Sequence, residues 1–248
     1  MGSRPLTVDG KVTGWVTARA TSCLAGQPGV VVDQEAVHMR PAPHRHMALN
    51  DVLANVAEVL QRAGCLRTWR NELLDVYGEG RCLGVIERAA MRPLGMLTKA
   101  VHLNAWTPEG RLWIARRADT KATDPGMWDT LVGGLAGSGE TLDHSLLREC
   151  NEEAGLAPEH IAERSPLRLI TRMHRRLPEG YQVEDLLVSD CVLAPSVAPR
   201  NMDGEVSEIR HVDIQELMDL IQAEQVTLEA ELVILEGLQR KLEFAGDR

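Results

Sequence analysis

The sequence predicts an α/β protein on three observations. Segments that alternate apolar and polar residues, as strands do, occupy residues 100–106 and 112–115 and recur at 167–177 and 182–193. Apolar residues recur at helical spacing in residues 49–63 and 228–242. A glycine-rich loop leads into a further helix that carries several acids and ends before Gly155. Helices and strands that follow one another in this way are expected to pack in layers.

The composition is that of an ordinary globular protein. The chain has 248 residues, of which 44% are hydrophobic and 25% charged, so one large or two small domains with a packed core are expected. Aromatic residues make up only 3%, so aliphatic side chains must fill that core. The formal net charge of −9 argues against a dedicated nucleic-acid partner, because phosphate contacts need clustered Lys and Arg.

The cysteines and the apolar runs bear on where the protein works. The five cysteines are scattered, odd in number and lack CxxC pairing, which favours reduced thiols in a cytosol. No apolar run is long enough to span a bilayer, and the N-terminus lacks a signal-peptide core. We therefore expect a cytoplasmic protein without a membrane partner. The oligomeric state stays open, with a homodimer as one option.

Residues 1–95 are predicted to form a small N-terminal domain of mixed α and β structure, whose role the sequence leaves undetermined. A hairpin is expected over residues 6–16, a short strand over 30–32, and a helix over 49–63 with Asn50 as its cap. His38, His44 and His46 fall in a predicted loop. Their irregular spacing favours solvation over metal binding.

Residues 96–248 are predicted to form a second domain, which opens with the hairpin at 100–115. In its central helix, Glu149, Glu152 and Glu153 stand at i, i+3 and i+4, so their carboxylates crowd one face. Arg148 can neutralise only part of that charge, and Mg2+ or Mn2+, which prefer oxygen ligands, would supply the remainder. The plainer interpretation of such a run is a solvated acidic helix. The helix is expected to open at Glu140 or Thr141.

A basic segment stands between the hairpin and this helix. Arg116, Arg117 and Lys121 are followed by a Pro-Gly turn and then by Trp128 and Asp129. The turn would fold the cations back toward the acidic helix, where Arg and Lys side chains would bind an anionic group. We therefore predict that these five residues bind substrate. A solvated strand end is the alternative.

Later segments supply further candidates. Two acids, Glu205 and Glu208, follow the predicted strands, and surface positions are the plain interpretation of both. His174 and Arg176 share one face of the strand at 167–177, with solvation as the default. Asp213 is expected to cap a helix that begins at Ile214. The helix at 228–242 is predicted to be amphipathic, with a stripe formed by Leu232, Leu235, Leu238 and Leu242.

The segment 133–156 resembles the Nudix box, Gly-x5-Glu-x7-Arg-Glu-apolar-x-Glu-Glu-x-Gly-apolar, with Cys150 in place of a larger aliphatic. The resemblance implies an α/β/α sandwich with a mixed sheet and a metal-dependent hydrolase of diphosphate-linked small molecules. It implies that Gly134 closes the loop against the helix and coordinates metal by its carbonyl, and that Glu140 fixes Arg148. The metal ligands would be Gly134, Glu149, Glu152 and Glu153. The resemblance also implies an extra carboxylate from a segment after the central strands, with Glu205 as the first candidate to assist a metal or water and Glu208 as the second. The catalytic set would be Arg148, Glu149, Glu152 and Glu205, with the proton acceptor left open among Glu149, Glu152 and Glu205.

Two short strings in the N-terminal region, at 69–72 and 87–90, and the RRxxxKxxxPGxxD arrangement at 116–129 resemble a Nudix subgroup associated with thiamine pyrophosphokinase. That resemblance implies hydrolysis of thiamine diphosphate, or of its oxidised and damaged analogues, to the monophosphate and phosphate. Two alternatives remain: a hydrolase of another nucleoside-diphosphate-linked compound, and a diphosphate sensor without turnover. Isomerase activity is less favoured, because no suitable Cys and Glu pair is found.

Overall fold

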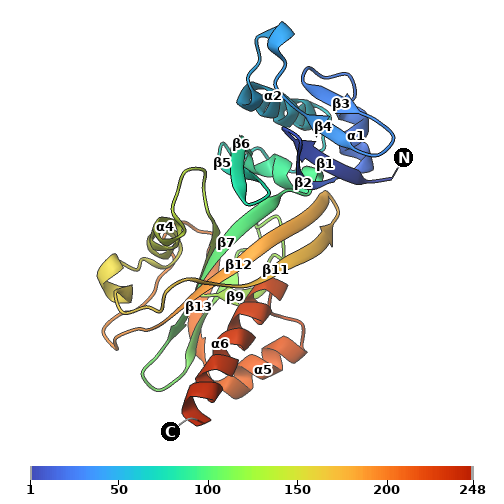
Figure 1. Ribbon diagram of the computed structural model, residues 1–248. Coiled ribbons are helices and arrows are strands. Elements are labelled where there is room, and N and C mark those ends of the chain that lie inside the picture. Colours follow the sequence, from blue (N-terminus) through green and yellow to red (C-terminus); the bar gives the residue numbers. More distant parts are fainter. Residues whose placement is uncertain (1, 247–248) are drawn as a thin grey trace. The chain divides into compact units, whose positions relative to one another are not determined.

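The computed structural model describes residues 2–246, and describes side chains as far as residue 243. The chain divides into two compact units (Figure 1). The first unit runs to Thr98 and also takes in Gly137–Gly139 and Arg172–Asp185. The second unit comprises Lys99–Ala136, Glu140–Thr171 and the remaining residues from Leu186. The α/β fold class is confirmed, and each unit is described on its own below.

The first unit contains a four-stranded sheet in the order β2-β1-β4-β3. The predicted hairpin is present: β1 pairs antiparallel with β2 through a turn at Asp9 and Gly10, both with positive φ. β1 pairs in parallel with β4, so the sheet is mixed. The strands are β1 (Arg4–Val8), β2 (Lys11–Val16), β3 (Val30–Val32) and β4 (Val37–Met39).

Helices and a second, two-stranded sheet follow in this unit. The helices are α1 (Ala18–Leu24) and α2 (Leu49–Arg62), and the strands are β5 (Leu73–Gly78) and β6 (Arg81–Glu87), followed by the short η2 (Arg88–Ala90) and α3 (Met91–Leu94). The predicted Asn50 cap is wrong. Asn50 lies inside α2, where its Oδ1 accepts from the Val85 amide at 3.0 Å, while Asp51 accepts from the Ala48 amide at 2.8 Å.

The three histidines do not share one loop. His38 lies in β4, where its ring nitrogens contact Thr7 Oγ1 at 2.7 Å and Asp33 Oδ2 at 3.0 Å. The predicted loop is therefore wrong at this residue. His44 lies in the short η1 (Pro43–Arg45) and His46 follows it, and both are exposed.

Most of a seven-stranded sheet belongs to the second unit. Its strand order is β11-β12-β7-β8-β13, with β10 paired to β7 and β9 paired to β8. The predicted β7–β8 hairpin is antiparallel. The bounds are β7 (Leu97–Trp106), β8 (Leu112–Arg117), β9 (Trp128–Thr130), β10 (Val132–Leu135), β11 (Arg168–Leu177), β12 (Gly180–Val192) and β13 (Val206–Val212).

Helices cover both faces of this sheet, which gives three layers (Figure 1). One hydrophobic cluster joins Val101 and Leu103 of β7 to Leu146 and Cys150 of α4 (Leu142–Ala154). The other cluster joins Trp106, at the opposite parity on β7, to residues of α5 (Ile214–Gln222) and α6 (Leu228–Gly246). Because successive strand residues point to opposite faces, the alternation along β7 builds both cores. An α/β/α sandwich results.

Helices α4 and α5 begin as predicted. Thr141 Oγ1 accepts from the His144 amide at 3.2 Å at the start of α4, and Gly155 closes that helix with φ of 62°. Asp213 Oδ1 accepts from the Glu216 amide at 2.9 Å at the start of α5. Cys150 is fully buried in the α4 core, as expected for a small apolar residue.

The predicted stripe of α6 is right at Leu238, which packs against the core around Trp106, and wrong at Leu235 and Leu242. Leu235 and Leu242 are 36% and 73% exposed, whereas Ala230, Val233 and Ile234 are fully buried. A Cβ added at Gly237 would lie 2.6 Å from Asn104 Nδ2 of β7. The helix therefore packs against the sheet through Ala230, Val233, Ile234 and Gly237, because the close approach of Gly237 to Asn104 leaves no room for a leucine side chain at that contact.

In the part of the chain that the structure describes, no helix combines the length and the apolar character of a membrane span.

Candidate active site

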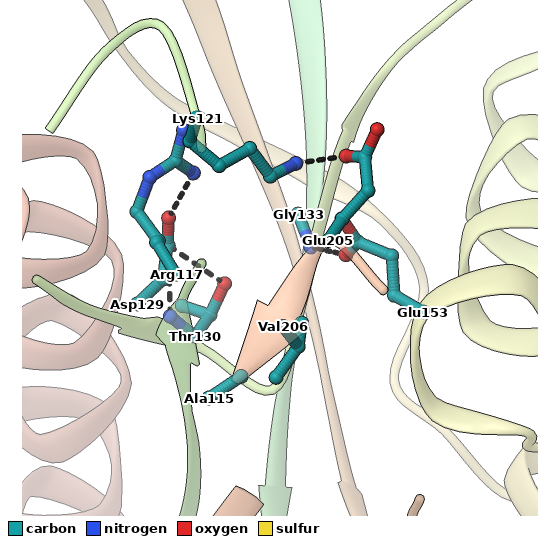
Figure 2. Close-up of a pocket in the computed structure, with 9 residues that line it drawn as sticks. All are labelled: Ala115, Arg117, Lys121, Asp129, Thr130, Gly133, Glu153, Glu205 and Val206. Carbon is teal, nitrogen blue, oxygen red and sulfur yellow. Dashed lines mark hydrogen bonds and ion pairs between the residues drawn. The ribbon is translucent and has the colours of Figure 1, made fainter. Parts of the chain in front are cut away.

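A pocket lies in the second unit where β8, β9, β10, α4 and the start of β13 meet (Figure 2). Strand pairing positions its walls: Ala115 of β8 is opposite Asp129 of β9, and Arg117 is opposite Val206 of β13. The lining residues are Ala115, Arg117, Lys121, Asp129, Thr130, Gly133, Glu153, Glu205 and Val206. Three acids and two cations thus line one small space, as expected for a site that binds a cation and an anionic group together.

Arg148 organises the acids of α4. Its Nε and Nη2 donate to the two oxygens of Glu140 at 2.9 and 3.0 Å, and its Nη1 donates to Glu149 at 2.8 Å and to Glu152 at 3.1 Å. Nη2 also reaches the Leu135 carbonyl at 3.2 Å. These bonds, those to Glu140 foremost, raise the pKa of Arg148. The expected Glu140–Arg148 ion pair is therefore present, and one guanidinium serves three carboxylates.

Glu153 differs from the other acids of the helix. Its side chain turns inward, where the residue is 8% exposed and Oε2 accepts from the Gly133 amide at 3.0 Å. Burial, and next the negative charge of Glu149, raise the pKa of Glu153 to about 8. Lys121 opposes that rise. Glu153 is thus a desolvated carboxylate whose charged form needs more positive charge than the surrounding protein supplies.

Gly134 lies directly against the acidic helix. A Cβ built on it would lie 2.0 Å from Cδ of Glu149, a distance that no side chain can occupy. Any other residue here would therefore displace the Glu149 side chain, since only a residue without Cβ lets β10 approach it this closely.

The predicted substrate-binding residues divide into two groups. Arg117 and Asp129 form an ion pair in the pocket at 2.9 Å, and Lys121 donates to Glu205 across it (Figure 2). Arg116 and Trp128 do not line the pocket. The Arg116 side chain donates to the Gly126 carbonyl at 2.9 Å, and Trp128 is 6% exposed within the core beneath α5 and α6.

Two further acids lie outside the pocket lining. Glu152 is half exposed beside Arg148, and Glu208 lies on β13 in a long contact of 3.7 Å with Arg210. His174 and Arg176 of β11 are exposed, in keeping with the expected solvation. Of the two later acids that were candidates, Glu205 lines the pocket together with Glu153, whereas Glu208 does not line it.

Four residues of the pocket lining were missed from the sequence: Ala115, Thr130, Gly133 and Val206. Thr130 Oγ1 contacts the Val132 carbonyl at 2.8 Å and His102 Nδ1 at 3.0 Å. His102 lies beneath Gly133, its partner in the β7–β10 pairing, and burial lowers the pKa of its ring. The alternation around His102 predicts only a strand, and strand pairing that no local pattern reveals brings the histidine to the site.

The donors fit a hard divalent cation in their chemistry. Carboxylate oxygens are the ligands that Mg2+ and Mn2+ prefer, and buried Glu153 lacks compensating charge. Within the described part of the chain, however, no three His, Cys, Asp or Glu side chains converge as a metal site would require. Arg148 accounts for this, because it draws Glu149 and Glu152 toward itself.

The fold and the pocket define an α/β sandwich domain with an acid-bearing helix beside a cationic strand end. Residues 96–232 match the NUDIX domain, and residues 2–98 match a domain of unknown function (DUF4743). The chain belongs to the Nudix family.

Individual relatives agree with this assignment. Nudix hydrolase 24, chloroplastic, of Arabidopsis thaliana is 30% identical over 175 residues, which cover 68% of this chain and 47% of that protein. Isopentenyl-diphosphate Delta-isomerase of Streptomyces griseus is 30% identical over 149 residues, covering 59% of this chain and 74% of the isomerase. The crystal structure of DR0079 from Deinococcus radiodurans superposes with a TM-score of 0.51 at 25% identity, covering 65% of this chain and 97% of that one. The chain spans about half the length of the first curated relatives it matches.

Proposed function

We propose that this protein is a divalent-metal-dependent hydrolase that cleaves a diphosphate linkage in a small molecule. The observation that carries the proposal is the meeting of Glu153, Glu205, Lys121 and Arg117 in one pocket beside the Arg148 network. A diphosphate brings negative charge that Lys and Arg bind, and its cleavage needs a positioned water and a proton acceptor. The names of relatives that are called Nudix hydrolases support the same reaction.

Each group has a distinct role in this proposal. Glu149, Glu152, Glu153 and the Gly134 carbonyl would hold Mg2+ or Mn2+, which when bound neutralises phosphoryl oxygens and acidifies water. Arg148 orients Glu149 and Glu152 through its contacts of 2.8 and 3.1 Å. Lys121 and Arg117 bind the phosphoryl oxygens.

The proton acceptor is proposed to be Glu149, Glu152 or Glu205. Of these, Glu205 lines the pocket next to Glu153, and its carboxylate accepts a hydrogen bond from Lys121 (Figure 2). Buried Glu153, with its pKa at about 8, is mostly protonated at neutral pH unless a cation compensates its charge, so we assign it to metal binding and not to the proton acceptors.

The substrate proposed first is thiamine diphosphate or one of its oxidised or damaged analogues, cleaved to the monophosphate and phosphate. Its support is the resemblance of residues 116–129 and of the N-terminal strings to the thiamine-pyrophosphokinase-associated subgroup. Trp128 offers no ring-stacking surface to such a substrate, because it is buried with Arg210 4.6 Å from its ring centroid. A pyrimidine or thiazole ring must therefore be bound by other groups.

We also propose that the first domain ends at residue 95, that the second begins at residue 96, and that the protein is cytoplasmic.

An isomerase similar to the Streptomyces griseus relative is less favoured by the structure. Cys150 and Cys191 are buried in the α4 core, and burial raises the pKa of both thiols, that of Cys191 to about 12. Buried, protonated thiols cannot reach a substrate in the pocket.

A substrate panel tests the proposal. Phosphate and monophosphate release are measured with purified protein, with Mg2+, with Mn2+ and with chelator, on thiamine diphosphate, its oxidised analogue, ADP-ribose, a dinucleotide polyphosphate and isopentenyl diphosphate. Metal-dependent turnover of the thiamine compounds supports the first substrate. Turnover confined to a nucleotide compound moves the assignment to another diphosphate. Tight binding of all compounds without any product would instead support a sensor.

A further inference from the structure

Part of the loop that precedes α4 belongs to the first unit. Gly137–Gly139 lies between Gly134 and Glu140 in the sequence, yet it clusters with the first unit, which includes β5. The segment reads Gly-Ser-Gly, and Gly139 has a φ of 75°. Two glycines leave such a loop with little conformational preference of its own. A fixed loop therefore needs an anchor outside itself.

Strand β5 supplies that anchor at Ser138. The Ser138 amide donates to the Leu73 carbonyl at 2.8 Å, and its hydroxyl donates to Asp75 Oδ1 at 2.9 Å. On the other edge of β5, strand β6 pairs along its length, with Asp75 opposite Val85. Ser138 thus attaches to the edge of β5 that β6 leaves open, through one main-chain bond and one side-chain bond.

Asp75 is itself held in place. Its second oxygen, Oδ2, accepts from the Tyr77 hydroxyl at 3.0 Å. Tyr77 stands two residues further along β5, on the same face, so the pair is set by the strand period. Burial, and next the bond to Asp75, raise the pKa of Tyr77 to about 12, so the hydroxyl remains a donor. The bond from Tyr77 therefore fixes the orientation of the Asp75 carboxylate that accepts from Ser138.

Ser138 lies between a main-chain bond of the loop and the cap of α4. The Ala136 amide donates to the Lys99 carbonyl at 2.9 Å, and Thr141 caps α4. Glu140, which binds Arg148 with both oxygens, is two residues beyond Ser138, a span of at most about 7 Å of chain. A displacement at Ser138 therefore changes where the carboxylate of Glu140 can lie.

We propose that Asp75 is a positioning residue for the hydrolysis, acting through Ser138 on the loop that presents Glu140 to Arg148. This inference rests on the proposed function and gives the N-terminal unit a role in it.

The test compares Asp75→Ala, Asp75→Asn, Ser138→Ala and the Asp75→Ala/Ser138→Ala double variant in the full chain. The control is Glu79→Gln, which removes an exposed acid paired with Lys11 at 2.7 Å in the turn after β5. Asp75→Ala and Ser138→Ala are each expected to lower kcat about tenfold, with KM within about twofold, since substrate contacts are untouched. The double variant should be no slower than the slower of the two single variants, because both single changes remove the same side-chain bond between Ser138 and Asp75. Asp75→Asn, whose amide oxygen still accepts from Ser138, should recover most of the rate.

A second readout does not depend on turnover. Amide hydrogen exchange of residues 136–140 should accelerate in Asp75→Ala and Ser138→Ala, but not in Glu79→Gln, while β7 stays protected in all of them. Unchanged kcat and unchanged exchange in Asp75→Ala, or equal losses in the control, would overturn the positioning role. If wild-type protein turns over no diphosphate, the proposed function fails. The exchange measurement then decides alone whether Asp75 fixes the loop.

Discussion

Arg148 binds Glu140 with two parallel hydrogen bonds, Nε to Oε1 at 2.9 Å and Nη2 to Oε2 at 3.0 Å. Glu140 precedes α4 and Arg148 lies in its second turn, so the pair joins the loop to the helix. The remaining nitrogen of the fork serves Glu149 and Glu152. The positions of two proposed metal ligands therefore depend on a planar guanidinium, which a point charge cannot replace.

Arg148→Lys is the first test of that dependence. Lysine keeps the charge but loses the two parallel bonds, so kcat/KM should fall about a hundredfold and the free energy of unfolding by about 1–2 kcal/mol. Steady-state kinetics and thermal unfolding measure the two effects. Arg62→Lys, at an exposed pair with Glu58 3.6 Å apart, should change neither. Full activity in Arg148→Lys would show that charge alone suffices.

Glu153 predicts a pH dependence of stability in the absence of metal. Its pKa rises from an ordinary 4.5 to about 8 in the folded protein, so the folded state holds the proton more tightly than the unfolded chain. The resulting stabilisation is fully present below pH 4.5 and is lost as the pH rises to about 8. The loss amounts to at most about 1.4 kcal/mol per pH unit across that window.

Glu153→Gln isolates this contribution, because glutamine cannot titrate. Denaturant unfolding of both proteins is measured with chelator between pH 4.5 and 8. The difference in free energy of unfolding, wild type minus variant, should decrease steadily with rising pH. A difference that stays constant with pH would mean that Glu153 titrates normally. Added Mg2+ should stabilise the wild type more than the variant at pH 8, since the cation compensates the buried charge.

Gly134→Ala should be destabilising through one identifiable contact. The new methyl group would lie 2.0 Å from Cδ of Glu149, so β10 or the glutamate must move, at a cost of roughly 1–3 kcal/mol. Thermal unfolding measures the loss. The double variant Gly134→Ala/Glu149→Ala should regain stability, because the contacting side chain is gone, while remaining inactive. If the double variant is no more stable than Gly134→Ala, another contact is responsible.

Lys121→Ala should weaken substrate binding more than catalysis. Lys121 faces the pocket and donates to Glu205, where a phosphoryl group would compete for the same ammonium. KM for the diphosphate is expected to rise about tenfold with kcat within about threefold, because a uniform binding contact is lost. Lys11→Ala, at the ion pair with Glu79, is the matched control. A fall in kcat alone would assign Lys121 to the chemical step instead.

Local chemistry explains which parts of the fold the sequence predicted. Thr141, Gly155 and Asp213 fix helix ends by contacts within a few residues, and all three were predicted correctly. The Asn50 cap was predicted wrongly, and so were Leu235 and Leu242 of the α6 stripe, because both features depend on distant partners. Asn50 binds Val85 on β6, and the face of α6 is chosen by the approach of Gly237 to Asn104.

The same distinction holds in the candidate site. The spacing of Glu149, Glu152 and Glu153 places them on one helix, but their side chains diverge, since Arg148 draws two of them out and Gly133 binds the third. Arg116 and Trp128 stand next to Arg117 and Asp129 in the sequence and yet face away from the pocket, because strand neighbours alternate. The bond between Asp75 and Ser138 joins residues 63 positions apart, beyond the reach of any local pattern.

The central claim is that the acids of α4 cleave a phosphoanhydride, and Glu152→Gln tests it most directly. Glu152 is 51% exposed at its side chain, so the change should leave folding intact, and Glu159→Gln provides an exposed control on the segment after α4. The measurement is the rate of Mg2+-dependent phosphate release from the best diphosphate substrate, at matched thermal stability. We predict a loss of about a hundredfold or more in kcat with substrate affinity within a few fold for Glu152→Gln, and no loss for Glu159→Gln. Turnover by Glu152→Gln at the wild-type rate would contradict the account.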